Sequence, residues 1–178
     1  MATQHRLRNG QTLAIRDVTP DDAGAVLQYV EAISSESDFL SFGPGEFGHS
    51  EDEERQEIRG HYQASNRFFI AGCIDDAFVS LLTFRGGHRP RNRHAGEFGM
   101  SVRKDYWGLG IGSAMLDSLV GWARGTEVVK KINLRVRTDN ARAISLYEWK
   151  GFVIEGTIRK DVLVEGRYFD HYCMGIEL

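Results

Sequence analysis

The sequence predicts an α/β fold of the α+β kind, in which a central, mostly antiparallel sheet is flanked by helices. Several segments alternate apolar and polar residues and are joined in pairs by short turns, which is typical of antiparallel hairpins. Two further strands, Gly96–Val102 and Lys131–Arg137, are separated by a helical segment, which makes their parallel pairing feasible. The 178 residues fall within the usual size of one domain, so we expect residues 1–178 to form a single domain.

The first third of the chain predicts one strand and two helices. Thr12–Val18 alternates as a strand, and Thr19-Pro20 then supplies an N-cap followed by a proline at the first helical position. The helix that follows has one apolar face, formed by Ala23, Val26, Leu27, Val30 and Ile33. A stretch rich in serine and glycine, Ser34–Gly48, interrupts it, and a polar helix is expected at about Ser50–Ala64.

The middle of the chain predicts a hairpin and then a strand that leads into a helix. Arg67–Ile74 and Phe78–Phe84 are rich in β-branched and aromatic residues and flank the turn-forming pair Asp75-Asp76. After the strand Gly96–Val102, the pattern becomes helical from Gly110 onward. The apolar stripe of this helix consists of Ile111, Met115, Leu119 and Trp122.

The last third predicts a strand, a short helix and a final hairpin. Lys131–Arg137 alternates as a strand, and Asn140–Lys150 carries a helical stripe that Gly151 ends in the left-handed C′ position. The chain closes with two strands and the turn between them: Phe152–Val164, Glu165-Gly166 and Tyr168–Ile176.

Composition and charge are those of an ordinary globular protein. Hydrophobic residues make up 42% of the chain and charged residues 26%, which is enough apolar material for a core. The formal net charge of −3 does not favour a nucleic-acid partner. Cys73 and Cys173 lie in apolar segments and are expected to be reduced. No segment approaches the run of about 20 apolar residues that crosses a bilayer, so we expect a cytoplasmic protein without a membrane partner.

A glycine-rich turn lies where the strand Gly96–Val102 leads into the following helix. Tyr106–Ser113 has three glycines in alternate positions, and the free N–H groups of a helix's first turn attract an anion such as a pyrophosphate. The spacing is G-x-G-x-G, which fits neither the dinucleotide fingerprint nor the P-loop, so NAD or ATP is the weaker alternative. Taken alone, these glycines are equally compatible with a tight turn that binds nothing.

A second motif follows 28 residues after Gly112, with the pattern Asn140-x-x-Ala143-x-x-Leu146-Tyr147-x-x-x-Gly151-Phe152. Together with Val102–Gly112, it resembles the coenzyme A signature of the Gcn5-related N-acetyltransferase (GNAT) superfamily. The resemblance covers roughly Leu13–Ile176. It implies a single-domain GNAT fold, a parallel strand pair that splays apart at the cofactor site, and an acetyl-CoA-dependent N-acetyltransferase.

The resemblance also implies which residues bind acetyl-CoA, the one cofactor expected, with no metal. The main chain of Gly108, Leu109, Gly110, Ile111, Gly112 and Ser113 would hold the pyrophosphate. The strand edge of Met100, Ser101 and Val102 would pair with the pantetheine arm. Asn140 lies where the family contacts pantetheine, although capping the next helix is as well supported by the sequence. Trp107 stands where the family usually has Arg or Gln.

Two residues are candidates for proton transfer. Tyr147 matches the family position near the thioester sulfur, where a phenol could protonate or hydrogen-bond the leaving thiolate, and its alternative role is core packing. Glu97 lies on the strand before the turn, where related enzymes often have a carboxylate that accepts the amine proton. A strand carboxylate can equally face solvent, and Asp170 or His171 are the reserves for the base.

The acceptor is the least determined feature. The resemblance assigns it to Glu31–Glu54 and Arg159–Tyr172, where the tail Glu165-Gly166-Arg167-Tyr168 is similar to that of spermidine acetyltransferases. A small primary amine, polyamine or amino-acid-like, is expected. The alternatives are a protein N-terminus or lysine and, in another class, a non-catalytic acyl-CoA-binding module.

Two charged segments have open roles, and the sequence allows a homodimer. The acidic residues that could attract a polycation, or form only a solvated face, are Glu36, Asp38, Glu46, Glu51, Asp52, Glu53 and Glu54. The basic segment 85–94 could meet the coenzyme's ribose phosphate, an acidic partner or ribosomal RNA, or it could be a solvated loop.

Overall fold

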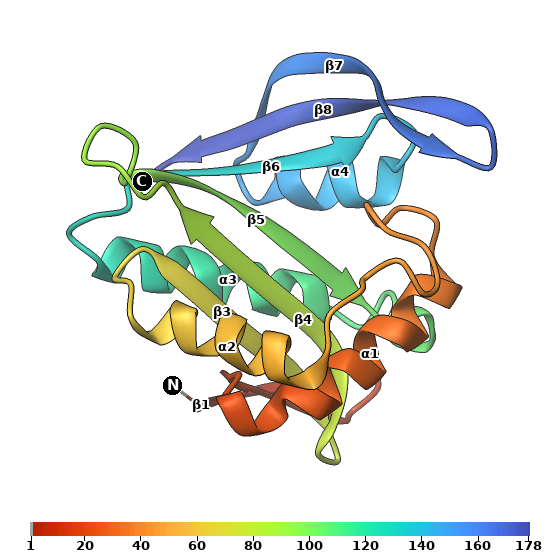
Figure 1. Ribbon diagram of the computed structural model, residues 1–178, viewed down its shortest axis with the longest axis vertical. Coiled ribbons are helices and arrows are strands. Elements are labelled where there is room, and N and C mark those ends of the chain that lie inside the picture. Colours follow the sequence, from red (N-terminus) through yellow and green to blue (C-terminus); the bar gives the residue numbers. More distant parts are fainter. Residues whose placement is uncertain (1) are drawn as a thin grey trace.

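The computed structural model describes residues 2–178 and contains one eight-stranded mixed sheet (Figure 1). The strands follow the spatial order β1-β2-β3-β4-β5-β6-β8-β7, and all neighbours are antiparallel except β5 and β6. The predicted fold is therefore confirmed. The strands are β1 (Ala2–Arg6), β2 (Thr12–Asp17), β3 (Arg67–Ile74), β4 (Ala77–Gly86), β5 (Ala95–Val102), β6 (Lys131–Arg137), β7 (Val153–Val164) and β8 (Arg167–Glu177).

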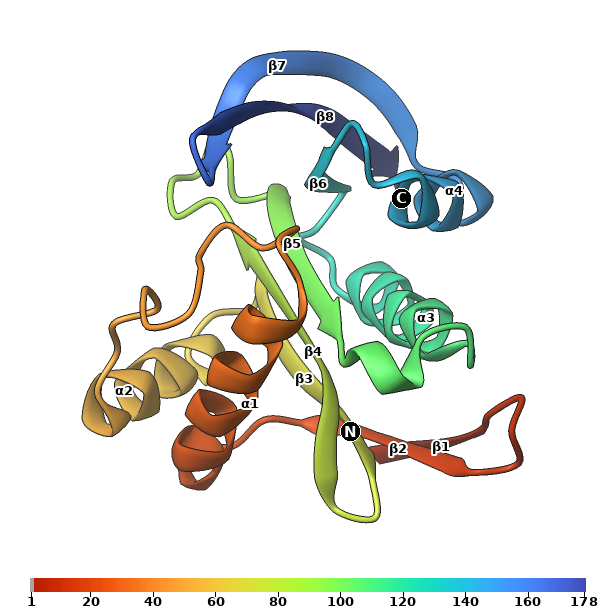
Figure 2. The same cartoon turned by 90° about the vertical axis from the view of Figure 1, so that its right-hand side faces the viewer.

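Helices cover both faces of the sheet. On one face lie α1 (Ala23–Glu36) and α2 (Glu51–Tyr62), and on the other lie α3 (Ile111–Gly125) and α4 (Ala141–Trp149) (Figure 2). Each face has its own core cluster, because successive strand residues point to opposite sides. Phe68 of β3 packs under α3, where its ring stacks on that of Trp122 at 4.6 Å, whereas the next residue, Phe69, belongs to the cluster under α1 and α2.

Local signals set the ends of these elements. Ser50 caps α2, because its Oγ accepts from the Glu53 backbone N–H while the Glu53 carboxylate accepts from the Ser50 backbone N–H. Asp75 and Asp76 both adopt positive φ, at 49° and 64°, and so close the β3–β4 hairpin with a tight turn. Gly151 ends α4 at φ 90°, as predicted from its C′ position.

The parallel pair β5–β6 is joined over only a short length. Its register begins at Ala95↔Lys131 and ends at Glu97↔Asn133. Beyond that point β6 pairs only with β8, while β5 still pairs with β4. From residue 98 to residue 102, the edge of β5 that faces β6 therefore has no strand beside it. The splay that the family resemblance implied is present.

Some features differ from the sequence expectation. Ala2–Arg6 forms a strand, β1, that was not predicted, and the helix expected to start at Pro20 begins with a 3₁₀ turn at Pro20–Asp22 before α1. Cys73 and Cys173 are free, as expected.

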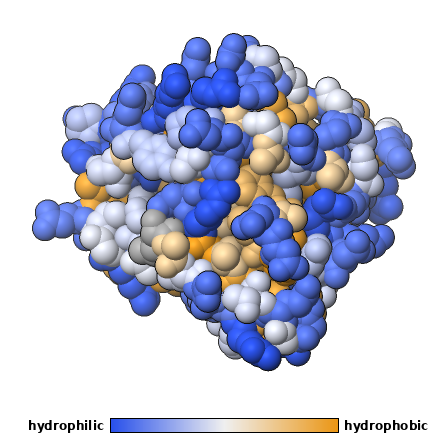
Figure 3. Space-filling view, turned by 90° about the horizontal axis from the view of Figure 1, so that it is seen from below, coloured by the Kyte–Doolittle hydropathy of each residue, from blue (hydrophilic) through white to orange (hydrophobic). Residues whose placement is uncertain are grey.

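The molecule seen from below has a hydrophilic rim around an apolar central area (Figure 3). Among residues 2–178, no helix is long and apolar enough to cross a membrane.

Candidate active site

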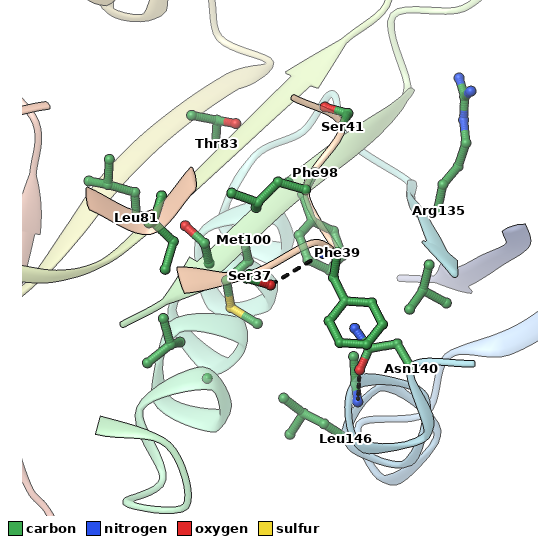
Figure 4. A pocket seen from close by; sticks show the side chains of 18 of the residues that line it. Ser37, Phe39, Ser41, Leu81, Thr83, Phe98, Met100, Arg135, Asn140 and Leu146 are labelled. Atoms are coloured by element: carbon green, nitrogen blue, oxygen red, sulfur yellow. Dashed lines mark hydrogen bonds between the residues drawn. The ribbon is translucent and has the colours of Figure 1, made fainter. Parts of the chain in front are cut away.

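A cavity of about 1490 Å³ opens where β5 and β6 diverge. Its walls come from β4, β5 and β6, from the starts of α3 and α4, and from the loop between α1 and α2. Figure 4 shows several lining residues from these elements: Leu81, Thr83, Phe98, Met100, Arg135, Asn140 and Leu146, with Ser37, Phe39 and Ser41 of the loop. The cavity therefore joins both faces of the sheet through the gap between the two strands.

The predicted glycine turn lines the cavity at the start of α3. Gly108 and Gly110 have φ values of 82° and 98°, which L side chains rarely adopt, so glycine is needed at both positions for backbone reasons. Gly112 is different: a Cβ there would come within 3.1 Å of Leu146, so it allows α3 to approach α4 closely. The side chain of Leu109 instead packs against the core under α3.

The N-terminus of α3 has free backbone donors. It has no side-chain cap, and the bond from Ala114 N–H to the Gly110 carbonyl is its first backbone bond. The N–H groups of Ile111, Gly112 and Ser113 precede that bond and have no partner within the helix. With the partial positive charge of a helix N-terminus, they form a site suited to an anion.

Two side chains that the sequence did not single out support this turn. Arg8, from the β1–β2 hairpin, donates from Nη1 to the Gly108 carbonyl at 3.3 Å, and its backbone N–H points to the Leu109 carbonyl at 3.4 Å. Arg142 of α4 lies over the Trp107 ring, 4.8 Å from its centroid, and lines the cavity. A positive charge is thus present beside Trp107, where the family motif usually has its own Arg or Gln.

Tyr147 lines the cavity from α4 and is 7% exposed. Its ring packs edge-on against Phe98 and Phe152, so it is part of the core as well. Burial raises the pKa of its phenol to about 12, because the charged form is poorly solvated there. The hydroxyl has no hydrogen-bond partner among residues 2–178, so its proton is available to a bound ligand.

Glu97 lies on the other face of β5, at the start of a charged chain that crosses the gap. Its carboxylate is 3.4 Å from Arg135 Nε, and both side chains are half exposed. Arg135 in turn lies 3.7 Å from Asp161 of β7, whose carboxylate is 3.1 Å from Nδ1 of His171. Glu97, Arg135, Asp161 and His171 all line the cavity, and sequence analysis missed Arg135 and Asp161.

The other predicted site residues divide into two groups. Met100, Ser101 and Val102 lie along the free edge of β5 and line the cavity. Asn140 also lines it while its Oδ1 accepts from the Ala143 N–H at 3.2 Å, which confirms the capping role. Asp170 is outside the cavity lining, and its carboxylate accepts from the Lys160 N–H, which makes it a structural residue of the β7–β8 hairpin.

Arg137 was missed by the sequence analysis and fixes the loop above the cavity. It is 4% exposed, and its guanidinium donates to the carboxylate of Asp139 and to the backbone carbonyl of Asp38. The same guanidinium lies between two rings, 4.6 Å from the centroid of Phe39 and 3.7 Å from that of Phe169. The loop after α1 is thereby held to β6 and β8.

The acidic segment of α2 is not a uniform solvated face. Glu51, Asp52 and Glu53 are exposed, but Glu54 is 3% exposed and lines the cavity. In the basic segment, only Arg85 lines the cavity, and it pairs with Glu57 at 3.0 Å. Within the described chain, no group of three His, Cys, Asp or Glu side chains could hold a metal ion.

The chain is similar to bacterial N-acetyltransferases. The L-amino acid N-acetyltransferase AaaT of Escherichia coli (strain K12) is 37% identical over 105 residues, which cover 59% of this chain and 65% of that protein, just under two thirds of its length. The spermidine N(1)-acetyltransferase of Vibrio cholerae is 24% identical over 148 residues, which cover 81% of this chain and 83% of that protein. The structure of an acetyltransferase of the GNAT family from Streptococcus pneumoniae matches with a TM-score of 0.90 and 27% identity, covering 93% of this chain and 99% of that one.

A family model agrees with these similarities. Residues 31–152, more than half of the chain, match the model of the Acetyltransferase (GNAT) family. At the level of the family, this confirms the acyltransferase class and acetyl-CoA as the co-substrate. From its sequence match, its fold and the splayed strand pair at its cavity, the chain belongs to the GNAT acetyltransferase family.

Proposed function

We propose that the protein transfers the acetyl group of acetyl-CoA to the primary amine of a small polyamine or amino-acid-like molecule. The observation that carries this proposal is the cavity that connects the glycine turn to the loop after α1 through the gap between β5 and β6. A cofactor and an acceptor can thus approach each other from the two faces of the sheet. The names of the two relatives, an L-amino acid and a spermidine acetyltransferase, support a small amine as the acceptor.

The lining residues fit acetyl-CoA. We infer that the free N–H groups at 111–113, with the backbone of 108–110, bind the pyrophosphate. Arg142, which lies beside Trp107, adds a positive charge for a phosphate. The free edge of β5 at Met100–Val102 offers backbone groups to the pantetheine amides, and Asn140 keeps its side-chain N–H₂ for the same arm.

The proposed reaction is direct attack of the amine on the thioester, which acetyl-CoA supplies when bound. The amine nitrogen bonds to the acetyl carbon while the carbon–sulfur bond breaks. Glu97 accepts the amine proton, directly or through water. Tyr147 donates a hydrogen bond to the departing sulfur. Because the thiol of a free cysteine has a pKa of about 8.5 and the pKa of Tyr147 is raised to about 12, the phenol is the weaker acid, and a hydrogen bond to the thiolate is favoured over full proton transfer.

The test is an amine panel in which free thiol released from acetyl-CoA is measured. Polyamines, diamines and free amino acids are compared with short peptides, and calorimetry compares acetyl-CoA with NAD and ATP. We expect acetyl-CoA to bind and at least one small amine to be acetylated. Binding without transfer to any acceptor would instead indicate a non-catalytic acyl-CoA-binding module, and transfer to peptides alone would indicate a protein acetyltransferase. Either result contradicts the proposal.

A further inference from the structure

Glu54 is a buried carboxylate at the acceptor end of the cavity. The three acidic residues before it on α2 are exposed to solvent, whereas Glu54 is 3% exposed and lines the cavity. Removing a carboxylate from water is costly unless a partner compensates its charge. The burial of the Glu54 carboxylate therefore requires an explanation, whereas the exposed acidic residues before it require none.

The internal partners of Glu54 satisfy only one of its two oxygens. Nδ1 of His49 lies 2.9 Å from Oε2. Oε1 accepts no hydrogen bond from any residue among 2–178. The ring of His49 lies 4.6 Å from that of Phe47, which is 5.3 Å from that of Phe42, and both phenylalanines line the cavity. An acidic group beside aromatic rings is a suitable environment for an organic cation.

Glu54 lies on a helix that packs over β3, whereas the gap lies between β5 and β6. The buried residues of α2 are Glu54, Ile58 and His61, and the His61 ring packs on Phe69 of β3. The sheet register then runs from Phe69 to Thr83 on β4 and from Thr83 to Gly99 on β5. Helix α2 therefore packs over β3, and two strand spacings separate β3 from β5, which borders the gap where the thioester would lie.

The arginines on the acceptor side of the cavity are each matched by a carboxylate. Arg85 pairs with Glu57, Arg137 pairs with Asp139 and Asp38, and Arg135 lies between Glu97 and Asp161. An acceptor carboxylate would have to displace one of these pairs. A second ammonium group would instead find the free oxygen of Glu54.

We propose, building on the proposed function, that Glu54 binds a second, non-reacting cation of the acceptor, so that the preferred substrate is a dicationic amine. A flexible diamine such as 1,5-diaminopentane is a suitable probe of such a site.

The experiment compares 1,5-diaminopentane with 1-aminohexane, in which a methyl group replaces the second ammonium. We expect the wild-type protein to prefer the diamine in kcat/KM. Glu54→Gln, which keeps the size of the side chain and an acceptor for His49, should lower the ratio of the two kcat/KM values by about ten- to a hundredfold, as for loss of a charged hydrogen bond. Because the variant removes a buried charge, its Tm should be equal or higher.

The matched control is Asp52→Asn, which removes a charge from the same helix at an exposed position and should leave the ratio unchanged. The proposal is overturned if amines are acetylated without preference for a second cation, if neutral-chain amino acids are better acceptors than the diamine, or if Glu54→Gln lowers only the Tm. If no amine is acetylated, the proposed function itself fails. Calorimetry with 1,5-diaminopentane then tests separately whether Glu54 forms a cation site. Binding that Glu54→Gln weakens supports the cation site, and absence of binding overturns it.

Discussion

Two side chains approach the gap between β5 and β6 from opposite faces of the sheet. Phe98, which packs against Tyr147, belongs to the core under α3 and α4, and its neighbour Glu97 points to the other face, where it meets Arg135. In the proposed reaction, the amine therefore loses its proton on one face while the sulfur is stabilised on the other. The two roles can be tested with separate substitutions.

Replacing Tyr147 by Phe should lower kcat by about a hundredfold, the size expected when one donor to a developing charge is lost. The ring contacts with Phe98 and Phe152 are kept, so the Tm and the affinity for acetyl-CoA should change little. Because the pKa of the phenol is raised to about 12, the wild-type hydroxyl stays protonated at neutral pH, and this residue should add no limb to the pH profile there. An unchanged turnover number would assign Tyr147 to packing alone.

Replacing Glu97 by Gln should lower kcat/KM by about a hundredfold, which is the low end for a general base. Glu148→Gln, at an exposed position of α4, serves as the control and should behave as the wild type. A Glu97→Gln protein with the wild-type kcat/KM rules out this residue as the base.

The part of the cavity at the glycine turn was predictable from the sequence, whereas the part beneath the loop after α1 was not. The glycine turn and Tyr147 belong to local motifs with a fixed spacing, and the structure brings both to the cavity. Arg137 depends on Asp38, which lies 99 residues away, so no local pattern reveals the contact. Glu54 stands in a run of four acidic residues, and only the packing of α2 separates it from its exposed neighbours.

At the level of elements, the start of α3 depends on the backbone of Gly110. Its φ of 98° lies outside the range that a residue with a Cβ easily adopts, although a Cβ there would meet no atom within 4 Å. An alanine at this position would be strained in its backbone but would not clash with a neighbour. Gly110→Ala should therefore lower the free energy of unfolding by about 1–3 kcal/mol. If the turn relaxes, the N–H groups of 111–113 move away from a bound pyrophosphate.

We therefore expect Gly110→Ala to weaken acetyl-CoA binding by about tenfold or more in calorimetry. Gly121→Ala in the middle of the same helix is the matched control, because its Cβ also meets open space and its φ is not positive. That control should bind acetyl-CoA as the wild type does and gain about 0.5–1 kcal/mol of stability. Equal affinity in both variants would contradict a pyrophosphate site at this turn.

Most elements were predictable because their residues show clear periodicity or carry end signals. The exception is β1, where residues 3–6 are polar and no residue contributes a buried side chain. This strand pairs with β2 through its backbone at the edge of the sheet, so its pairing leaves no hydrophobic pattern in the sequence. Its hairpin still bears on the site, because it carries Arg8 to the glycine turn.

At the scale of the whole molecule, two layers under different helices share one sheet, and the layer under α1 and α2 contains an unusual buried histidine. His61 packs on Phe69, and neither of its ring nitrogens has a hydrogen-bond partner among residues 2–178. Burial lowers its pKa from 6.5 to about 4, and the positive charges of Arg85 and Arg67 act in the same direction, against the attraction of Glu57. The folded protein therefore holds this ring in its neutral form.

This depressed pKa makes the stability of the fold depend on pH. Between about pH 6.5 and pH 4, the unfolded chain binds a proton at His61 that the folded protein does not, so stability is full above that window and is lost as the pH falls through it. The loss from this group between pH 7 and pH 5 should be about 2 kcal/mol. His61→Leu removes the titrating ring, so denaturant unfolding at the two pH values should show a difference smaller by that amount. If the wild type and the variant lose the same stability on acidification, the acid sensitivity arises from other groups.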